Sequence, residues 1–254
     1  MAAKQPLSDS VRLDELLVAR GLFPSRSRAR DAILRGTVTV NGEAAAKAGE
    51  AVGTDAELAV ADPARAYVSR AALKLIAALD HFAFDPAGAD ALDIGASTGG
   101  FTEVLLERGA AHVTALDVGH GQLSPKLAGD LRVTSLEGLN ARHLTVADLA
   151  GCVPDFLVSD VSFISLKLAL PPALAIAADR ACGIFLVKPQ FEAGREAIGK
   201  GGLLRYPAEG ERIAKEMRAW LGRQPGWRAI GLHPSPIGGG DGNREYLLGG
   251  VKDR

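Results

Sequence analysis

Short apolar runs alternate with helical stretches through most of this chain, and this alternation constrains the fold more than any other feature. Runs that suit β-strands fall at about residues 90–94, 112–117, 131–136, 155–159 and 183–187. Helical or mixed stretches separate them, which is typical of a parallel sheet with helices on both faces. Two more strands, at 227–232 and 245–251, are expected to form an antiparallel edge. The sequence therefore predicts an α/β fold, with a mostly parallel, seven-stranded sheet of the Rossmann type.

Residues 10–62 follow another pattern, which predicts a small α+β module in front of the sheet. Ser10 and Ser25 suit the N-caps of two short helices, each followed by a glycine. Strand-like alternation then runs into Asn41-Gly42, a strong hairpin signal. We therefore expect two helices followed by strands.

The chain is expected to divide into four segments. These are a disordered N-terminus at 1–9, the front module at 10–62, a linker at 63–68 and the catalytic α/β domain at 69–254. Pro63 disfavours a helix before it, and Ser69 can cap the next one, so the boundary falls between them.

The composition limits the partners and the cellular compartment. The 29 basic and 30 acidic residues nearly cancel, so any nucleic-acid surface must be local. Two cysteines without metal-type spacing fit a reduced interior, and no apolar run is long enough to span a membrane. A cytoplasmic protein that does not act in membranes is expected.

A glycine loop at residues 93–101 follows one strand and opens a helix, so that a ligand can approach its backbone. It lacks the G-x-G-x-x-G spacing and carries Asp93 at the strand end, which favours S-adenosylmethionine over NAD. Asp117 ends the next strand, where ribose hydroxyls of an adenosine would lie. A tight turn with Asp117 as a helix cap, and Asn140 as an ordinary turn residue, are the structural alternatives. The candidate cofactor-binding residues are Asp93, Gly95, Ala96, Ser97, Thr98, Gly99, Gly100, Phe101, Asp117, Val118, Asn140 and Asp160.

Four charged residues are expected at the cleft of the sheet. Asp160 and Lys188 each close an apolar run, Glu245 opens one, and Lys74 lies on a helix before the glycine loop. Methyl transfer to a hydroxyl needs an aligned nucleophile and an acceptor for one proton. A second ammonium nearby disfavours the charged form of Lys188, which makes Lys188 the candidate base. Each residue alone also has a structural interpretation, as a cap, a surface lysine or an edge-strand pair.

A local basic run is expected to bind RNA. It lies between residues 20 and 35, and a glycine-rich loop at 192–205 adds two further cations beside Lys188. A solvated helix face without a ligand is the alternative. The five histidines show no metal-ligand spacing, so we expect no metal. The candidate RNA-binding residues are Arg20, Arg26, Arg28, Arg30, Arg35, Arg195 and Lys200.

Five motifs together resemble TlyA-type methyltransferases, which are often labelled haemolysin A. The motifs begin at Ser69, Ala91, Ala115, Asp160 and Val187, and read SRAALKL, ALDIGASTGGFT, ALDVGHGQL, DVSFISL and VKPQFE. The resemblance implies an FtsJ-like catalytic domain behind a ribosomal-protein-type RNA-binding domain.

The resemblance also implies an activity and a site. The activity is 2′-O-methylation of cytidine in ribosomal RNA, with S-adenosylmethionine as cofactor and ribosomal RNA or ribosomal subunits as partner. The catalytic tetrad of the family would be Lys74, Asp160, Lys188 and Glu245. A membrane-active haemolysin and a non-catalytic ribosome-binding or assembly factor remain the alternatives, and the oligomeric state is unspecified.

Overall fold

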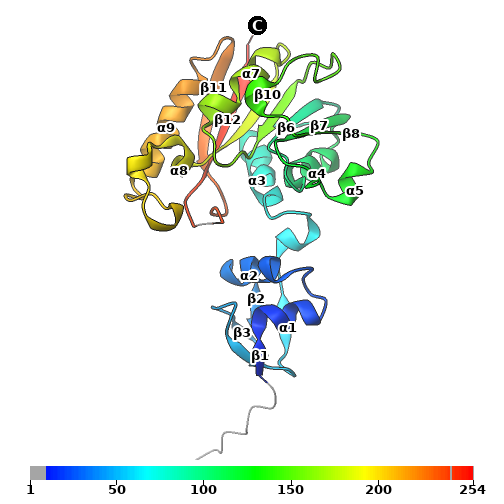
Figure 1. The fold of residues 1–254 in the computed structure, drawn as a ribbon, viewed down its shortest axis with the longest axis vertical. Helices are drawn as coiled ribbons and strands as arrows, with labels where there is room; N and C mark the ends of the chain where they lie inside the picture. The colour runs from blue at the N-terminus through cyan, green and yellow to red at the C-terminus, as the bar shows by residue number, and fades with distance from the viewer. Residues whose placement is uncertain (1–9, 241, 254) are drawn as a thin grey trace, which may run out of the picture. The chain divides into compact units, whose positions relative to one another are not determined.

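The computed structural model describes residues 10–240 and 242–253, and the chain divides into two compact units between Ala66 and Tyr67 (Figure 1). This division falls inside the predicted linker of residues 63–68. The predicted disordered segment at 1–9 lies outside the described residues.

Between residues 10 and 66, the first unit contains two helices, five short strands and a 3₁₀ turn around its own apolar core. Leu13, Leu17 and Ile33 are fully buried in this core. The strands form a two-stranded sheet, β1 with β4, and a three-stranded sheet in the order β3-β2-β5. The elements are β1 (Ser10–Arg12), α1 (Leu13–Ala19), α2 (Arg26–Leu34), β2 (Val38–Val40), β3 (Glu43–Ala44), β4 (Ala51–Gly53), β5 (Leu58–Val60) and η1 (Pro63–Ala66).

The caps of the two helices differ from each other. The Ser25 side chain accepts a hydrogen bond from the Arg28 backbone N–H, which confirms Ser25 as the N-cap of α2. The prediction for Ser10 was wrong: Ser10 begins β1, and Arg12 precedes α1. Ser10 pairs with Gly53 in β4, about forty residues later in the chain. This strand pairing prevails over the local tendency of a serine to cap a helix. Asn41 and Gly42 both have positive φ and join β2 to β3, as the hairpin signal predicts.

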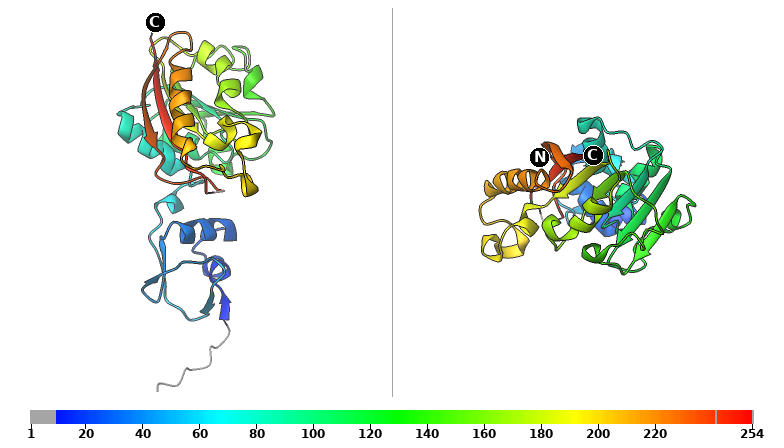
Figure 2. Two further views of the ribbon diagram at one scale, coloured as in Figure 1. Left: turned by 90° about the vertical axis from the view of Figure 1, so that its left-hand side faces the viewer. Right: turned by 90° about the horizontal axis from the view of Figure 1, so that it is seen from above.

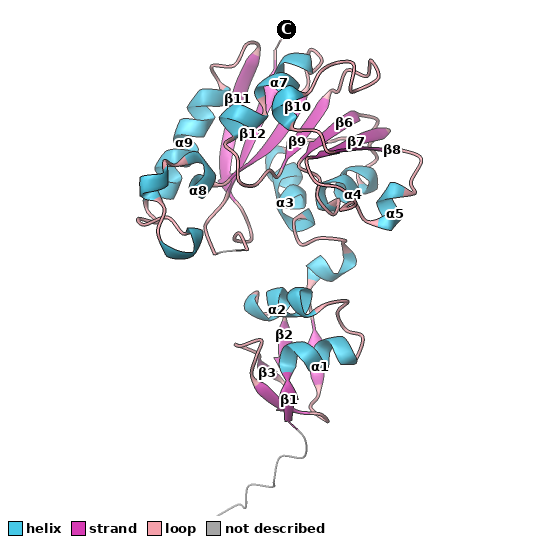
Figure 3. Cartoon of the chain, in the orientation of Figure 1, coloured by secondary structure: helices cyan, strands magenta, loops and turns pink. Residues whose placement is uncertain are grey.

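The second unit is built on the predicted seven-stranded sheet (Figure 3). The strand order is β11-β12-β10-β9-β6-β7-β8. β12 pairs antiparallel with both β10 and β11, whereas the other described neighbouring strands of this sheet pair parallel. The strands are β6 (Asp90–Ile94), β7 (His112–Asp117), β8 (Val133–Glu137), β9 (Phe156–Ser159), β10 (Cys182–Val187), β11 (Trp227–Pro234) and β12 (Tyr246–Lys252).

Helices cover both faces of this sheet and form two apolar layers (Figure 2). The layer on one face joins the sheet to α3 and α4; the layer on the other joins it to α6, α7 and α9. Successive side chains of β6 alternate between them, since Ala91 packs with the first layer and Leu92 with the second. The helices are α3 (Ala72–Phe82), α4 (Gly100–Glu107), α5 (Pro125–Ala128), α6 (Leu166–Ala169), α7 (Pro171–Ile176), α8 (Pro189–Glu192) and α9 (Glu209–Leu221), with 3₁₀ turns η2 (Ala141–His143), η3 (Arg195–Ala197) and η4 (Lys200–Gly202).

The ends of several predicted elements shift. β8 begins at Val133 rather than at residue 131, where Leu131 is fully exposed. Ser69 does not cap α3 directly: its Oγ accepts from the Ala71 N–H, in the turn before the helix. The last strand, β12, inserts between β10 and β11. The edge strand of the sheet is therefore β11, and the antiparallel strand β12 lies next to it. This insertion brings the start of β12 beside the end of β10, where Val187 pairs with Tyr246.

Candidate active site

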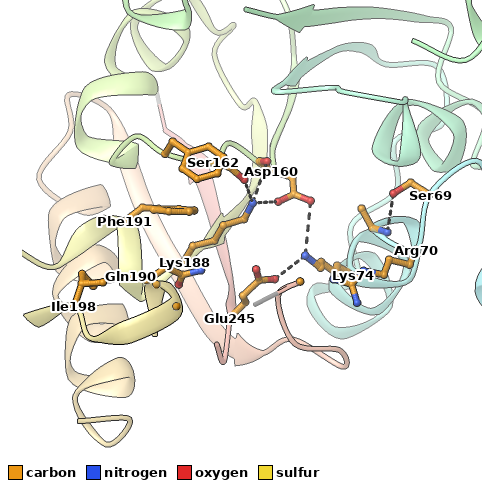
Figure 4. Close-up of a pocket in the computed structure, with 15 residues that line it drawn as sticks. Ser69, Arg70, Lys74, Asp160, Ser162, Lys188, Gln190, Phe191, Ile198 and Glu245 are labelled. Carbon is orange, nitrogen blue, oxygen red and sulfur yellow. Dashed lines mark hydrogen bonds and ion pairs between the residues drawn. The ribbon is translucent and has the colours of Figure 1, made fainter. Parts of the chain in front are cut away.

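The four predicted catalytic side chains meet at one edge of the sheet (Figure 4). Asp160 follows β9 and Lys188 follows β10, so both leave the carboxyl ends of neighbouring parallel strands. Glu245 immediately precedes β12, whose antiparallel direction places its beginning at the same edge. Lys74 reaches the same point from the first turn of α3. The tertiary fold therefore gathers residues that are up to 171 positions apart in the sequence (245 − 74).

Their charges alternate along a chain of ion pairs. The Lys74 Nζ lies 2.6 Å from Glu245 Oε2 and 3.8 Å from Asp160 Oδ2, and the Lys188 Nζ lies 2.6 Å from Asp160 Oδ1. Lys74, Lys188 and Glu245 are buried, while the side chain of Asp160 is 16% exposed. Two positive and two negative groups balance, which lets the sheet hold four ionised side chains away from bulk water.

Lys188 makes two contacts besides its ion pair. Its Nζ donates to Ser162 Oγ at 2.7 Å and to the backbone oxygen of Asp160 at 3.3 Å. The amine faces a cavity of about 520 Å³ that Lys74, Asp160 and Glu245 also line. A nucleophile bound in this cavity would meet the Lys188 amine directly.

The glycine loop turns sharply at the end of β6. Gly95 and Gly99 have φ angles of +85° and +94°, which favour glycine. A Cβ on Gly95 would lie 2.9 Å from Val161 Cγ1, so the side chain must be absent for the loop to pack against Val161. A Cβ on Gly99 would likewise clash with the Leu127 side chain.

Asp93 lies beneath this loop and is fully buried. Its Oδ2 accepts a 2.7 Å hydrogen bond from Thr102, whereas its Oδ1 is buried without a hydrogen-bond partner among the described residues. Burial raises the pKa of Asp93 to about 7, against the opposing effect of the Thr102 bond. Asp93 lines a cavity of about 160 Å³ shared with Asp160 and Lys188. An unsatisfied carboxylate oxygen facing such a cavity suits a ligand that carries an ammonium group.

The remaining predicted cofactor residues line two adjoining cavities. A cavity of about 1030 Å³ runs along the ends of β6 and β7, past Asp117, Val118 and Asn140. Gly95 and Ser97 line both this cavity and the 160 Å³ cavity beside Asp93. The 160 Å³ cavity is also lined by Ala96, Thr98, Gly100 and Phe101. Gly99 is thus the one predicted loop residue that the structure places elsewhere within the described part of the chain.

Asp117 and Asn140 already hold the backbone of this region. The Asp117 carboxylate accepts from the backbone N–H of Ser97 and from that of Gly119, both at 2.8 Å. The Asn140 side-chain oxygen accepts from the Arg142 N–H and caps the η2 turn. Asn140 is thus a turn residue, as its structural alternative states, whereas Asp117 holds two loop N–H groups and is not the N-cap of α4 or α5. Both residues border the large cavity.

Two aromatic residues beside Lys188 were not singled out from the sequence. Phe163 is 90% exposed and has a φ of +65°, and its ring centroid lies 5.1 Å from that of Phe191. Both rings border the 520 Å³ and the 1030 Å³ cavities. An apolar residue at a strand end, inside the DVSFISL motif, was the signal that could have identified Phe163.

The predicted basic run of the first unit separates into residues with structural contacts and one without. Arg20 donates to the backbone oxygens of Thr54 and Ala56, and Arg28 donates to that of Ala64. The Arg30 side chain is exposed and forms no ion pair or hydrogen bond with the described residues.

Two further arginines of this run form ion pairs. Arg26 pairs with Asp14 at 3.1 Å, and Arg35 pairs with Asp62 at 2.7 Å. The Arg35 side chain is only 14% exposed and its Asp62 partner 2%, so this pair belongs to the interior of the first unit. The run is therefore less uniformly available to a ligand than its spacing suggests.

The other two predicted RNA-binding residues lie in the second unit. Arg195 in η3 is exposed and borders the 1030 Å³ cavity. Lys200 in η4 is exposed next to Gly201 and Gly202, which line the 520 Å³ cavity. Both are thus near the catalytic edge of the sheet.

The described residues contain neither a candidate metal site nor a candidate membrane-spanning helix. Over residues 10–240 and 242–253, no group of three or more His, Cys, Asp or Glu side chains is placed to hold a metal ion. Within the same part of the chain, no helix has the length and apolar character needed to cross a membrane.

The chain matches two family models. The model of FtsJ-like methyltransferases matches residues 67–252, and the model of the S4 domain matches residues 11–58. These spans correspond to the second and first units of the fold.

Similar proteins carry two kinds of name. The 16S/23S rRNA (cytidine-2′-O)-methyltransferase TlyA of Mycobacterium tuberculosis is 48% identical over 240 residues, which cover 93% of this chain and 88% of that protein. Hemolysin A of Brachyspira hyodysenteriae is 41% identical, with 93% and 98% covered. A solved structure from Streptococcus thermophilus, also carrying the hemolysin name, has a TM-score of 0.75 and 42% identity over 96% of this chain and 89% of that one. On this evidence, the chain belongs to the FtsJ-like methyltransferase family, in its TlyA-type branch, with an S4 domain preceding the catalytic domain.

Proposed function

We propose that this protein transfers a methyl group from S-adenosylmethionine to the 2′-hydroxyl of a cytidine ribose in ribosomal RNA. The observation that carries the proposal is the chain of ion pairs Glu245–Lys74–Asp160–Lys188 beside the glycine loop. The name of the M. tuberculosis relative states the same reaction for that protein. Ribosomal RNA as substrate would place the protein in the cytoplasm.

The residues around the glycine loop fit S-adenosylmethionine. Its amino group would meet the unsatisfied Oδ1 of Asp93, and its adenosine would lie along Asp117, Val118 and Asn140. Gly95, which has no side chain, lets the loop pack against Val161 beside these cavities. When bound, this cofactor supplies a methyl group attached to a sulfonium sulfur, and the sulfur becomes a neutral thioether when the methyl group is transferred.

Lys188 is the residue that manages the proton. As the 2′-oxygen bonds to the methyl carbon, the hydroxyl proton moves to the lone pair of a neutral Lys188 amine. Asp160 holds that amine by its 2.6 Å contact, and Lys74 holds the second oxygen of Asp160 at 3.8 Å. Glu245 in turn fixes Lys74. The order of the ion pairs supports proton transfer by Lys188 and an orienting role for the other three residues.

The RNA would be bound by both units. In the S4 domain, exposed Arg30 is the residue best placed to contact phosphate, because no protein partner competes for it among the described residues. Near the site, Arg195 and Lys200 supply further positive charge. The exposed ring of Phe163 offers a stacking surface for the base of the target nucleotide.

The direct test is methyl transfer in vitro. Ribosomal subunits that lack the modification are incubated with the protein and S-adenosylmethionine labelled in its methyl group, and the modified ribose is mapped on the RNA. Lys188→Ala should abolish transfer and retain cofactor binding measured by calorimetry. Lys215→Ala is the matched control, because Lys215 is exposed on α9 and its one ion pair within residues 10–240 and 242–253 is with Glu211. Transfer by the Lys188 variant at the wild-type rate would reject the mechanism.

The same assay separates the two alternatives. A ribosome-assembly factor without activity would bind subunits and the cofactor but leave the RNA unmodified. A membrane-active haemolysin would release dye from liposomes, and Lys188→Ala would not affect the release. Either result, together with an unmodified ribose, would replace the proposed function.

A further inference from the structure

Ser162 borders each of the three cavities at the end of the sheet. Only Asp160 and Ser162, within the described part of the chain, line all three of them. Ser162 itself is exposed, while the Lys188 amine that it contacts is buried. The serine therefore lies where cofactor, base and nucleophile would have to meet, although it is outside the set of four charged residues.

The contacts of Lys188 indicate what this serine does. The Lys188 amine donates two hydrogen bonds, one to Ser162 Oγ at 2.7 Å and one to the Asp160 backbone oxygen at 3.3 Å. Its Nζ also lies 2.6 Å from Asp160 Oδ1, in an ion pair without hydrogen-bond geometry. A neutral amine has two N–H groups and one lone pair, so the two hydrogen bonds account for both N–H groups. The bond to Ser162 is the shorter and stronger of the two.

This geometry fixes the direction of the lone pair. With one N–H held by Ser162 Oγ and the other by the Asp160 backbone oxygen, the lone pair is confined to the remaining tetrahedral direction. An incoming hydroxyl would donate its proton along this direction. Without Ser162, one N–H would be free to rotate, and the lone pair would sample orientations that do not face the nucleophile.

We propose that Ser162 is a positioning residue of the methyl-transfer site, which orients the lone pair of neutral Lys188 toward the 2′-hydroxyl. This inference rests on the proposed function, since it assigns a role within that reaction. It does not require Ser162 to touch the cofactor or to carry a proton.

Three substitutions at this position test the hydrogen bond itself. Ser162→Ala removes the acceptor, Ser162→Cys keeps nearly the same volume with a thiol that accepts weakly, and Ser162→Thr keeps the hydroxyl. We expect kcat to fall about tenfold to a hundredfold in the Ala and Cys variants, part of the usual contribution of a general base. KM for RNA and the calorimetric Kd for S-adenosylmethionine should stay within about threefold, and the Thr variant should recover most of kcat.

The controls distinguish positioning from a loss of structure. Ser135→Ala, an exposed serine on the edge strand β8, should keep the wild-type kcat, and thermal unfolding of each variant shows whether it folds. If Ser162→Ala fails to fold, Ser162→Cys gives the result. The inference is overturned if both variants keep kcat within twofold, if only KM for RNA rises, or if Ser162→Thr is as slow as Ser162→Ala. A wild-type protein that transfers no methyl group would instead reject the proposed function.

Discussion

The buried pair between Lys74 and Glu245 can be tested by separating its contribution to stability from its role in the reaction. The perturbation is a pair of near-isosteric changes, Lys74→Met and Glu245→Gln, made singly and together. Lys74 Nζ and Glu245 Oε2 lie 2.6 Å apart, and their side chains are 6% and 2% exposed. Each single change leaves a buried charge without its nearest partner, whereas the double change removes both charges.

The distance sets the magnitude. Two unit charges 2.6 Å apart attract by about 6 kcal/mol at an effective dielectric constant near 20, before the cost of desolvation. Breaking a buried pair by removing one partner typically costs about 3–5 kcal/mol, and replacing both partners is often close to neutral. In a unit of this size, that loss lowers Tm by roughly 6–20 °C. We therefore expect two strongly destabilised single variants and a double variant close to the wild type.

The assay is chemical and thermal unfolding of the full chain. With single losses of about 3–5 kcal/mol each and a double loss near zero, the double-mutant cycle should give a coupling free energy of roughly 6–10 kcal/mol. Methyl transfer, measured on the same samples, should stay at least about a hundredfold below wild type in all three variants. Lys74→Met removes the contact to Asp160, and Glu245→Gln removes the carboxylate that fixes Lys74. The double variant would then be stable but inactive.

An exposed pair provides the control. Lys215 and Glu211 on α9 are 2.7 Å apart, but their side chains are 67% and 63% exposed. The matching changes Lys215→Met and Glu211→Gln should each alter stability by less than about 1 kcal/mol. Single losses of that small size at Lys74 and Glu245, or strictly additive losses in the double variant, would refute the reasoning from burial.

Three further predictions follow from the site and the S4 domain. Because the folded-state pKa of Asp93 is raised to about 7, the native protein retains a proton that the unfolded chain releases, so stability should fall as pH rises from about 4 to 7. Asp93→Asn should flatten this dependence in unfolding experiments across that range. Arg30→Ala should weaken binding to ribosomal RNA and reduce its salt slope by about one, whereas Arg35→Ala should mainly lower Tm; equal effects on binding would contradict this division. Phe163→Ala should raise KM for RNA about 5- to 150-fold with unchanged cofactor affinity, the equivalent of about 1–3 kcal/mol of stacking.

Local patterns in the sequence predicted most of the second unit. The alternation of apolar runs and helical stretches predicted the parallel strands within two residues, because a strand buried on both faces must be apolar along its whole length. Polar residues at the ends of these runs were then expected at one edge of the sheet, and Asp160 and Lys188 lie there. The resemblance to a known family added the substrate and the roles of the four charged residues.

Elements held by distant partners were less predictable. β1 and β4 have three residues each and pair across about forty positions, so neither carries a local signal strong enough to identify it. The position of β12 between β10 and β11 depends on which strands pair, and this is not encoded in the period of either segment. Ser162 and Phe163 lie in an irregular segment between β9 and α6, for which hydrophobic periodicity gives no information.

The sequence by itself thus determined the sheet, the glycine loop and the residues that carry charge to its edge, because these follow from short-range spacing and residue type. The tertiary structure alone decided the order of the ion pairs, from Glu245 through Lys74 and Asp160 to Lys188. It also decided that Arg35 is buried against Asp62 while Arg30 is exposed. The physical reason is that several residues of the same charge are available to each partner of opposite charge. Which of them pair depends on distances of a few ångströms between segments far apart in the chain, and burial then determines how strongly each pair interacts.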